Sequence, residues 1–206
     1  MDAPPCKVVA VIFPEFELLD LYGPLEIFGR LRDRVSITLV SEHGGLIASS
    51  QGPRAVSDGT MSSVDACDIL VVPGGWGTRR EVASEPFLEQ LRVLARKAQL
   101  VTSVCTGSAL LARAGILDGM RATSNKVAFD WAASQSTQVT WVREARWVED
   151  GRFFTSSGIS AGMDMALAVV QRRFDRTVSL EIARQAEYLW NDDRSFDPFA
   201  ALPPQT

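Results

Sequence analysis

The sequence predicts an α/β protein with a doubly wound, mostly parallel sheet. Short apolar runs rich in β-branched residues alternate with segments whose apolar residues recur at helical spacing. Several of these runs are apolar at nearly every position, as is typical of strands covered by helices on both faces. Glycine, proline and acidic residues gather where the runs end. Because such sheets bind ligands outside the carboxyl ends of their strands, these junctions are the candidate site.

The bulk composition of the 206-residue chain indicates one soluble domain and excludes several classes of partner. The formal net charge of −4 argues against nucleic acid or an anionic membrane as the main partner. No apolar run approaches the roughly 20 residues that a membrane span needs. Residues 1–7 lack the basic region of a secretory signal, so we expect a cytoplasmic protein. We predict a single domain over residues 1–206, with 1–6 and 191–206 as extensions.

Cysteine and histidine are scarce. The three cysteines, Cys6, Cys67 and Cys105, are widely spaced and odd in number, which favours free thiols in a reducing compartment. His43 is the single histidine, and no His/Cys cluster has the spacing of metal ligands. We therefore expect neither a disulfide framework nor a zinc site.

Strands are predicted from short β-branched runs and from the turn residues that bound them. Residues 7–13 read KVVAVIF and end at Pro14, and residues 68–73 read DILVVP and lead into a glycine-rich loop. Residues 44–56 are punctuated by Gly, Ser and Pro, which predicts an exposed loop and hairpin. The predicted strands are 7–13, 36–41, 68–73, 100–104, 121–124, 139–142, 147–148 and 152–156, with a turn at 149–151.

Helices are predicted where apolar residues recur every three or four positions. Glu85-Pro86 opens one of them, and Gly115 ends a short helix built from small residues. Beyond residue 191 the chain is polar and contains proline, so we expect a docked extension or a frayed end. The predicted helices are 20–28, 85–98, 108–114, 127–133, 161–174 and 175–189.

Cys105 lies at the junction between the strand 100–104 and the helix 108–114. A strand that turns sharply into a helix exposes the side chain at the turn and points free helix N–H groups at the atom it attacks. The positive end of the helix also favours the thiolate, which predicts a lowered pKa for the Cys105 thiol. Cys105 is therefore a candidate nucleophile, although a free cysteine at this position could equally be a buried structural residue.

A cysteine nucleophile needs a group that accepts its proton. His43 follows a different strand, so we interpret it as a surface loop residue. Asp20 stands in an acidic loop among leucines, and a partly desolvated carboxyl exchanges protons near neutral pH. Asp20 could also be the N-cap of the helix that follows, and the two roles can coexist. Glu15 and Glu17 are either solvated loop acids or substitutes for Asp20 in proton transfer.

The residues on either side of Cys105 suggest how a developing charge could be held. The backbone N–H groups of Gly75 and Thr106 are candidates for an anion hole, although most Gly-Gly pairs are plain turns. The Thr106 hydroxyl could instead satisfy a backbone N–H at the helix start. Trp76 is either a wall of the pocket or a core residue. No phosphate-binding glycine loop of the GxxxxGK[ST] type occurs.

Four loops at the carboxyl ends of predicted strands carry these candidates, namely residues 15–20, 74–77, 105–107 and 157–160. A parallel sheet brings such loops to one edge, where ligands bind. The sequence therefore predicts one site that combines all four loops.

Three motifs in these loops resemble the ThiJ/PfpI superfamily, which has the class I glutamine-amidotransferase-like fold. They are Val72-Pro73-Gly74-Gly75, Ser103-Val104-Cys105-Thr106-Gly107 and Ser157-Gly158-Ile159-Ser160-Ala161-Gly162-Met163-Asp164. The resemblance extends from residue 8 to about residue 189 and implies a flavodoxin-like three-layer α/β/α sandwich that forms a homodimer. Within the superfamily, the elbow, the Gly-Ile-Ser-Ala-Gly junction and the loop before Asp20 are most similar to isonitrile (isocyanide) hydratases.

The resemblance implies roles for individual residues. Cys105 corresponds to the nucleophile, Asp20 to its proton-transfer partner and Thr106 to an assisting group. The N–H groups of Gly75 and Thr106 correspond to the donors that hold the developing charge, and Ile159 corresponds to a residue that lines the pocket.

One position departs from the pattern of the superfamily. Many members have a histidine after the strand that follows the elbow, whereas this sequence has Asn125. A Cys–His dyad is therefore missing, which argues against peptidase and histidine-dependent glyoxalase activity. Members fused to a helix-turn-helix domain are transcriptional regulators, and we expect no such domain because the sequence stops soon after the last predicted helix.

The leading hypothesis is a cofactor-free hydro-lyase that hydrates a small isonitrile to an N-substituted formamide. Thiolate attack on the isonitrile carbon gives a thioimidate, and water releases the formamide while Asp20 supplies and accepts protons. One alternative is an amidase-type or glyoxalase-like enzyme that acts on small carbonyl compounds. Another is a redox sensor without enzymatic activity, in which Cys105 oxidises to a sulfinic acid beside Asp20.

Overall fold

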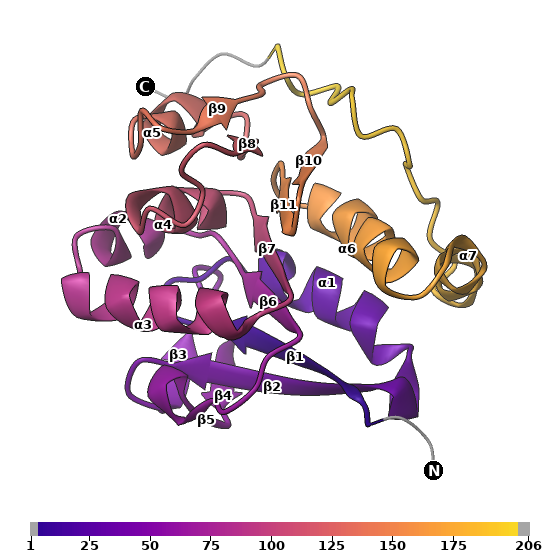
Figure 1. Ribbon diagram of the computed structural model, residues 1–206, viewed down its shortest axis with the longest axis horizontal. Helices are drawn as coiled ribbons and strands as arrows, with labels where there is room; N and C mark the ends of the chain where they lie inside the picture. Colours follow the sequence, from indigo (N-terminus) through magenta and orange to yellow (C-terminus); the bar gives the residue numbers. More distant parts are fainter. Residues whose placement is uncertain (1–3, 202–206) are drawn as a thin grey trace.

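A seven-stranded sheet forms the centre of the computed structural model, which describes residues 4–201 (Figure 1). The strand order is β10-β11-β7-β6-β1-β2-β5. Neighbouring strands are parallel except β10 and β11, which pair antiparallel. The strands are β1 (Cys6–Val11), β2 (Val35–Ser41), β5 (Gly59–Thr60), β6 (Ile69–Val72), β7 (Leu100–Val104), β10 (Trp147–Asp150) and β11 (Phe153–Ser156). The predicted parallel sheet is confirmed.

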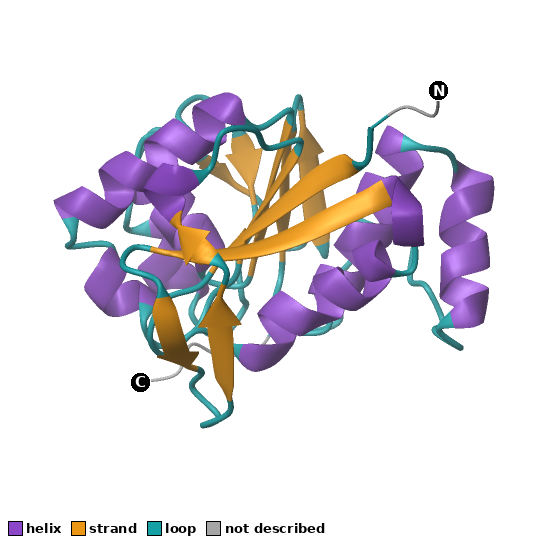
Figure 2. Ribbon diagram, turned by 90° about the horizontal axis from the view of Figure 1, so that it is seen from below, coloured by secondary structure: helices purple, strands orange, loops and turns teal. Residues whose placement is uncertain are grey.

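Helices cover both faces of this sheet and make a three-layer sandwich, as Figure 2 shows. On one side lie α1 (Leu18–Gly29), α6 (Ala161–Arg173) and α7 (Arg176–Gln185), and on the other lie α2 (Thr78–Glu81), α3 (Glu85–Lys97) and α4 (Gly107–Arg113) (Figure 1). Residues of β6 are all buried because helices cover the strand from both sides. The flavodoxin-like α/β/α architecture predicted from the sequence is therefore confirmed.

Smaller elements decorate the sandwich. The predicted hairpin is present as β3 (Gly45–Ala48) paired antiparallel with β4 (Arg54–Ser57). A parallel pair, β8 (Arg121–Ala122) and β9 (Thr140–Trp141), lies beside α5 (Phe129–Ala133) (Figure 1). Two single-turn 3₁₀ helices occupy Arg32–Arg34 and Met61–Ser63. Among residues 4–201, no helix combines the length and the apolar character that a membrane crossing requires.

Three details of the predicted elements are wrong. The last helix ends at Gln185 instead of Leu189, and Glu187 adopts a left-handed φ of 50° that a helix cannot accommodate. Glu149 and Asp150 continue strand β10, so the turn begins only at Gly151. The helix α2 was not predicted, because a single turn of four residues is too short to show a periodic pattern.

The chain after α7 docks back onto the sandwich through the buried carboxylate of Asp164 in α6. Its Oδ1 accepts from the Tyr188 hydroxyl at 3.0 Å and from the Asn191 N–H at 2.9 Å, and its Oδ2 accepts from Arg146 Nε at 2.7 Å. Residues 191–201 are thus a docked extension, whereas 202–206 and 1–3 lie outside the described residues. Cys6, predicted to belong to the N-terminal extension, is the first residue of β1.

We expect Asp164→Ala to lower the free energy of unfolding by about 3–5 kcal/mol, because it leaves the buried Arg146 guanidinium without its carboxylate. Asp192→Ala is the matched control, since it removes a carboxylate from an exposed pair with Arg176 and should cost less than about 1 kcal/mol. Urea denaturation followed by circular dichroism measures both. Equal losses in the two variants would contradict the assigned role of Asp164.

Candidate active site

The predicted loops meet at one edge of the sheet because β1, β6, β7 and β11 are neighbours and run parallel. There they enclose a pocket of about 250 Å³. Five residues singled out from the sequence line it, namely Gly75, Trp76, Cys105, Thr106 and Ile159. Asp20 lies directly behind the pocket, fully buried. The structure thus brings together the residues that the sequence placed in separate loops.

Cys105 occupies the sharp turn between β7 and α4. Its φ of 56° lies in the left-handed region, which non-glycine residues rarely adopt and which is common at functional turns. The turn is braced through the Cys105 carbonyl, which accepts hydrogen bonds from the hydroxyls of Ser108 and Ser124 at 3.0 Å each. The side chain is 7% exposed and borders the pocket, so a small molecule can reach the sulfur.

The helix predicted to begin at Asp20 begins two residues earlier, at Leu18, so Asp20 is the third residue of α1 and its alternative role as a helix N-cap is wrong. The residue at the cap is Glu17, whose side chain makes no capping hydrogen bond. Asp20 Oδ2 accepts from the Gly74 N–H at 3.0 Å, while the buried Oδ1 has no hydrogen-bond partner within residues 4–201. A Cβ at Gly74 would lie 2.9 Å from Asp20 Oδ2 and 2.6 Å from Thr106 N, so only glycine allows this contact.

Burial dominates the acid–base properties of the Asp20–Cys105 pair. Loss of water raises the pKa of the Asp20 carboxyl well above its ordinary value. Burial also raises the pKa of the Cys105 thiol, and the adjacent Asp20 charge raises it further. The lowered thiol pKa expected from the helix end is therefore wrong, because desolvation outweighs the favourable Thr106 N–H. Ionisation of either group places a negative charge beside the other, and that charge opposes ionisation of the second group.

The backbone donors around Cys105 are not equally available. The Gly75 N–H already donates to Thr106 Oγ1 at 3.1 Å. The Thr78 hydroxyl lies 2.7 Å from the Gly75 carbonyl and 3.2 Å from Thr106 Oγ1, which completes a small buried network. The Thr106 N–H instead points at the Cys105 thiol. Of the two donors expected to form an anion hole, only the one from Thr106 is directed at the reacting sulfur.

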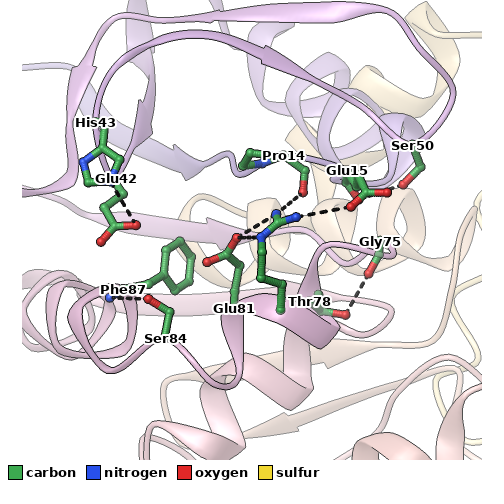
Figure 3. Close-up of polar contacts among 11 residues, drawn as sticks. Pro14, Glu15, Glu42, His43, Ser50, Gly75, Thr78, Glu81, Ser84 and Phe87 are labelled. Carbon is green, nitrogen blue, oxygen red and sulfur yellow. Dashed lines mark hydrogen bonds and ion pairs between the residues drawn. The ribbon is translucent and has the colours of Figure 1, made fainter.

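His43 is removed from this pocket. It lies 3.6 Å from Glu42 in a separate hollow next to Phe87, as Figure 3 shows. Its interpretation as a surface loop residue is confirmed. Glu15 does not line the Cys105 pocket, and its carboxylate pairs with Arg80 at 3.2 Å (Figure 3). Glu17, in contrast, lines the Cys105 pocket.

Two polar residues of the pocket were not predicted to line it. Asn125 accepts from the Ala128 N–H at 2.9 Å, which leaves its amide N–H₂ to face Gly158 and the Cys105 sulfur. The signal in the sequence was that Asn125 stands at the position where many members of the superfamily have a histidine. Arg79 comes from α2 and projects beside Trp76, which is 60% exposed and therefore a pocket wall rather than a core residue. No sequence signal identified Arg79, because α2 itself was not predicted.

Among residues 4–201, no group of three His, Cys, Asp or Glu side chains is placed to hold a metal ion. All three cysteines are free in the structure. The polar side chains that line the pocket are those of Glu17, Arg79, Cys105, Thr106 and Asn125, and the buried Asp20 carboxyl lies behind it.

The DJ-1/PfpI family matches residues 6–172 of the sequence. The chain belongs to this family. An isonitrile hydratase of Pseudomonas putida is 34% identical over 178 residues, which are 86% of this chain and 76% of that protein. The crystal structure of a THiJ/PfpI family protein from Pseudomonas syringae has a TM-score of 0.82 at 29% identity and covers 89% of this chain and 75% of that one. The resemblance recognised in the sequence is confirmed.

Relatives in the DJ-1/PfpI family also include regulators. The HTH-type transcriptional regulator CdhR of Pseudomonas aeruginosa is 28% identical over 179 residues, which are 85% of this chain and 53% of the regulator. Membership of the family therefore does not by itself show that a member is an enzyme. The function of this chain has to be argued from the residues of its pocket.

We expect iodoacetamide to modify Cys105 with a pH midpoint above the value of about 8.5 that is typical of a free thiol, because burial raises the pKa of Cys105. Asp20→Asn should lower the midpoint, since it removes the adjacent negative charge. Glu15→Gln removes the same charge outside the pocket and should leave the midpoint unchanged. Peptide mass spectrometry resolves Cys105 from Cys6 and Cys67. A wild-type midpoint at or below that of a free thiol would contradict a raised pKa for the Cys105 thiol.

Proposed function

We propose that the protein is an isonitrile hydratase, which adds water to R–N≡C to give the formamide R–NH–CHO. The observation that carries this proposal is the buried Asp20 carboxyl, which is adjacent to the Cys105 thiol behind a pocket that no histidine lines. Hydration of an isonitrile begins with a proton added to its carbon, and an acid with a raised pKa delivers protons well. The similarity to the P. putida hydratase supports the same reaction.

In the first step, the Asp20 carboxylate accepts the Cys105 proton and delivers it to the isonitrile carbon. The sulfur bonds to that same carbon, which gives the thioimidate Cys–S–CH=N–R and restores the Asp20 carboxylate. The proton need not pass through water, since Asp20 and Cys105 are neighbours in the same buried volume.

In the second step, Asp20 accepts a proton from water as the oxygen attacks the thioimidate carbon, and it passes the proton to the nitrogen. The product of this step is Cys–S–CH(OH)–NH–R. The C–S bond then breaks as the hydroxyl proton moves through Asp20 to the sulfur, which releases R–NH–CHO and restores the thiol. The sum is one isonitrile and one water converted to one formamide, with no redox change.

Two donors can hold the charge that develops during these steps. The Thr106 N–H is directed at the sulfur and favours its thiolate form. The Asn125 amide faces the same space from the opposite wall near Gly158 and is suited to the substrate nitrogen. We assign no such role to the Gly75 N–H, because Thr106 Oγ1 already occupies it.

The pocket residues favour the hydratase over the two alternatives, a hydrolase or glyoxalase and a redox sensor. A hydrolase or glyoxalase of the cysteine–histidine type requires an imidazole near the sulfur, and the position of that group is taken by Asn125. A redox sensor requires a thiolate at neutral pH, because the thiolate is the form that peroxide oxidises. Burial works against that requirement by raising the pKa of Cys105.

We expect Cys105→Ala and Cys105→Ser to abolish hydration of an alkyl isonitrile while thermal unfolding changes little, because both replacements fit the space of the thiol. Formamide production followed by gas chromatography measures the activity. Cys67→Ser is the control, since Cys67 is buried away from the pocket. Turnover at the wild-type rate without Cys105 would rule out the covalent mechanism.

We expect Asp20→Asn to lower kcat by roughly 10²–10⁴-fold, because the amide has the same size but cannot exchange a proton at neutral pH. The thermal midpoint measured on the same preparation should be little changed. Glu15→Gln should retain activity, since Glu15 lies outside the pocket. Near-normal turnover of Asp20→Asn would assign the proton transfer to another group, with Glu17 as the nearest carboxylate that lines the pocket.

A further inference from the structure

Two adjacent arginines at the start of α2 have opposite surroundings. Arg80 is fully engaged: it pairs with Glu15 at 3.2 Å and with Glu81 at 2.8 Å, and it donates to the Pro14 carbonyl at 2.9 Å (Figure 3). Arg79 is exposed, and its side chain forms no ion pair or hydrogen bond with residues 4–201. Only Arg79 lines the Cys105 pocket. The pocket therefore contains a guanidinium whose N–H donors have no partner in the described part of the chain.

Two tryptophans hold this guanidinium at the pocket. The central carbon of Arg79 lies 4.4 Å from the ring centroid of Trp76 and 4.6 Å from that of Trp131. Stacking of this kind uses the faces of the guanidinium and limits the rotamers of a long side chain. All five N–H donors lie in the plane of the group, so their edge stays free for an acceptor. The pair of N–H bonds on that edge matches the two oxygens of a carboxylate.

Glu17 lines the same pocket as Arg79, but the two side chains form no ion pair with each other. Glu17 also borders a neighbouring hollow of about 450 Å³, together with Leu19 and Phe199, and Arg79 does not border that hollow. One Glu17 oxygen accepts from Gln51 Nε2 at 2.8 Å. Asp20, the other carboxyl close to Cys105, is fully buried and does not line the pocket. Arg79 is the one cation among the residues that line the pocket.

We propose that Arg79 forms a subsite for an anionic substituent, so that the preferred substrates are isonitriles that carry a carboxylate on the R group. This inference rests on the proposed function for the reacting group, but the subsite itself is a property of the pocket. A carboxylate bound in two-point fashion by Arg79 fixes one end of the molecule, and the isonitrile carbon at the other end reaches the Cys105 sulfur. Arg79 then sets KM for such substrates and leaves the chemical step to Cys105 and Asp20.

The kinetic test compares isocyano-carboxylates of one to three methylene groups with their methyl esters, which have nearly the same shape but no charge. We expect the wild-type protein to prefer at least one acid over its ester by about 10- to 100-fold in KM, the range of a charged hydrogen-bonded pair. Arg79→Gln should abolish the preference, Arg79→Lys should restore part of it, and kcat should change little. Arg96→Gln, an equal charge change on α3 away from the pocket, should leave the preference unchanged.

A binding test separates this inference from the proposed reaction. Cys105→Ser is titrated by calorimetry with the N-formyl amino acids that the same acids would yield, and with their methyl esters. We expect the acids to bind about 10- to 100-fold more tightly, and the difference to vanish when Arg79→Gln is added. If no isonitrile is hydrated but this binding pattern holds, the proposed function fails and the anion subsite stands. If acid and ester bind equally, or if Arg79→Gln leaves their ratio unchanged, the subsite is overturned.

Discussion

The hydrogen bond from the Gly74 N–H to the buried Asp20 carboxyl, at 3.0 Å, is the contact on which the candidate site depends. It joins α1 to the loop after β6, and the close approach of Thr106 at Gly74 adds the elbow after β7 to the same cluster. Three segments that are far apart in the sequence thereby pack around one carboxyl. A carboxyl removed from water with one oxygen unpaired is unfavourable for folding. Such unfavourable groups gather at functional sites, so we attribute Asp20 to function rather than to stability.

The interior and the rim of the pocket have different physical characters. In the interior, Asp20 and Cys105 share a volume from which water is excluded, and both are driven towards their neutral forms. At the rim, the guanidinium of Arg79 contacts the indole rings of Trp76 and Trp131. In the proposed reaction, the buried pair carries out the bond changes and Arg79 binds the anionic substituent of the substrate.

Much of the fold was predictable because its signals are local. The strands β1, β6 and β7 lie within a few residues of their predicted positions, since runs of β-branched residues have few other stable arrangements. The prediction failed where an element was short or depended on distant contacts. The helix α2 has four residues and no periodic pattern. The first helix was expected to begin at Asp20, but α1 begins two residues earlier after Glu17, whose side chain makes no capping hydrogen bond that the sequence could have signalled.

The sequence by itself determined the alternation of strands and helices, the elbow at Cys105 and the absence of a histidine from the position filled by Asn125. Each of these follows from residues that are neighbours in the chain, so sterics and hydrophobic periodicity are sufficient. The tertiary structure alone decided which loop acids face the pocket, that the Gly75 N–H is occupied, that Arg79 is beside Trp76 and Trp131, and that burial raises the pKa of Cys105. These properties depend on how segments that are distant in sequence pack together and exclude water. The packing and the desolvation arise only when the sheet has brought the strand ends together.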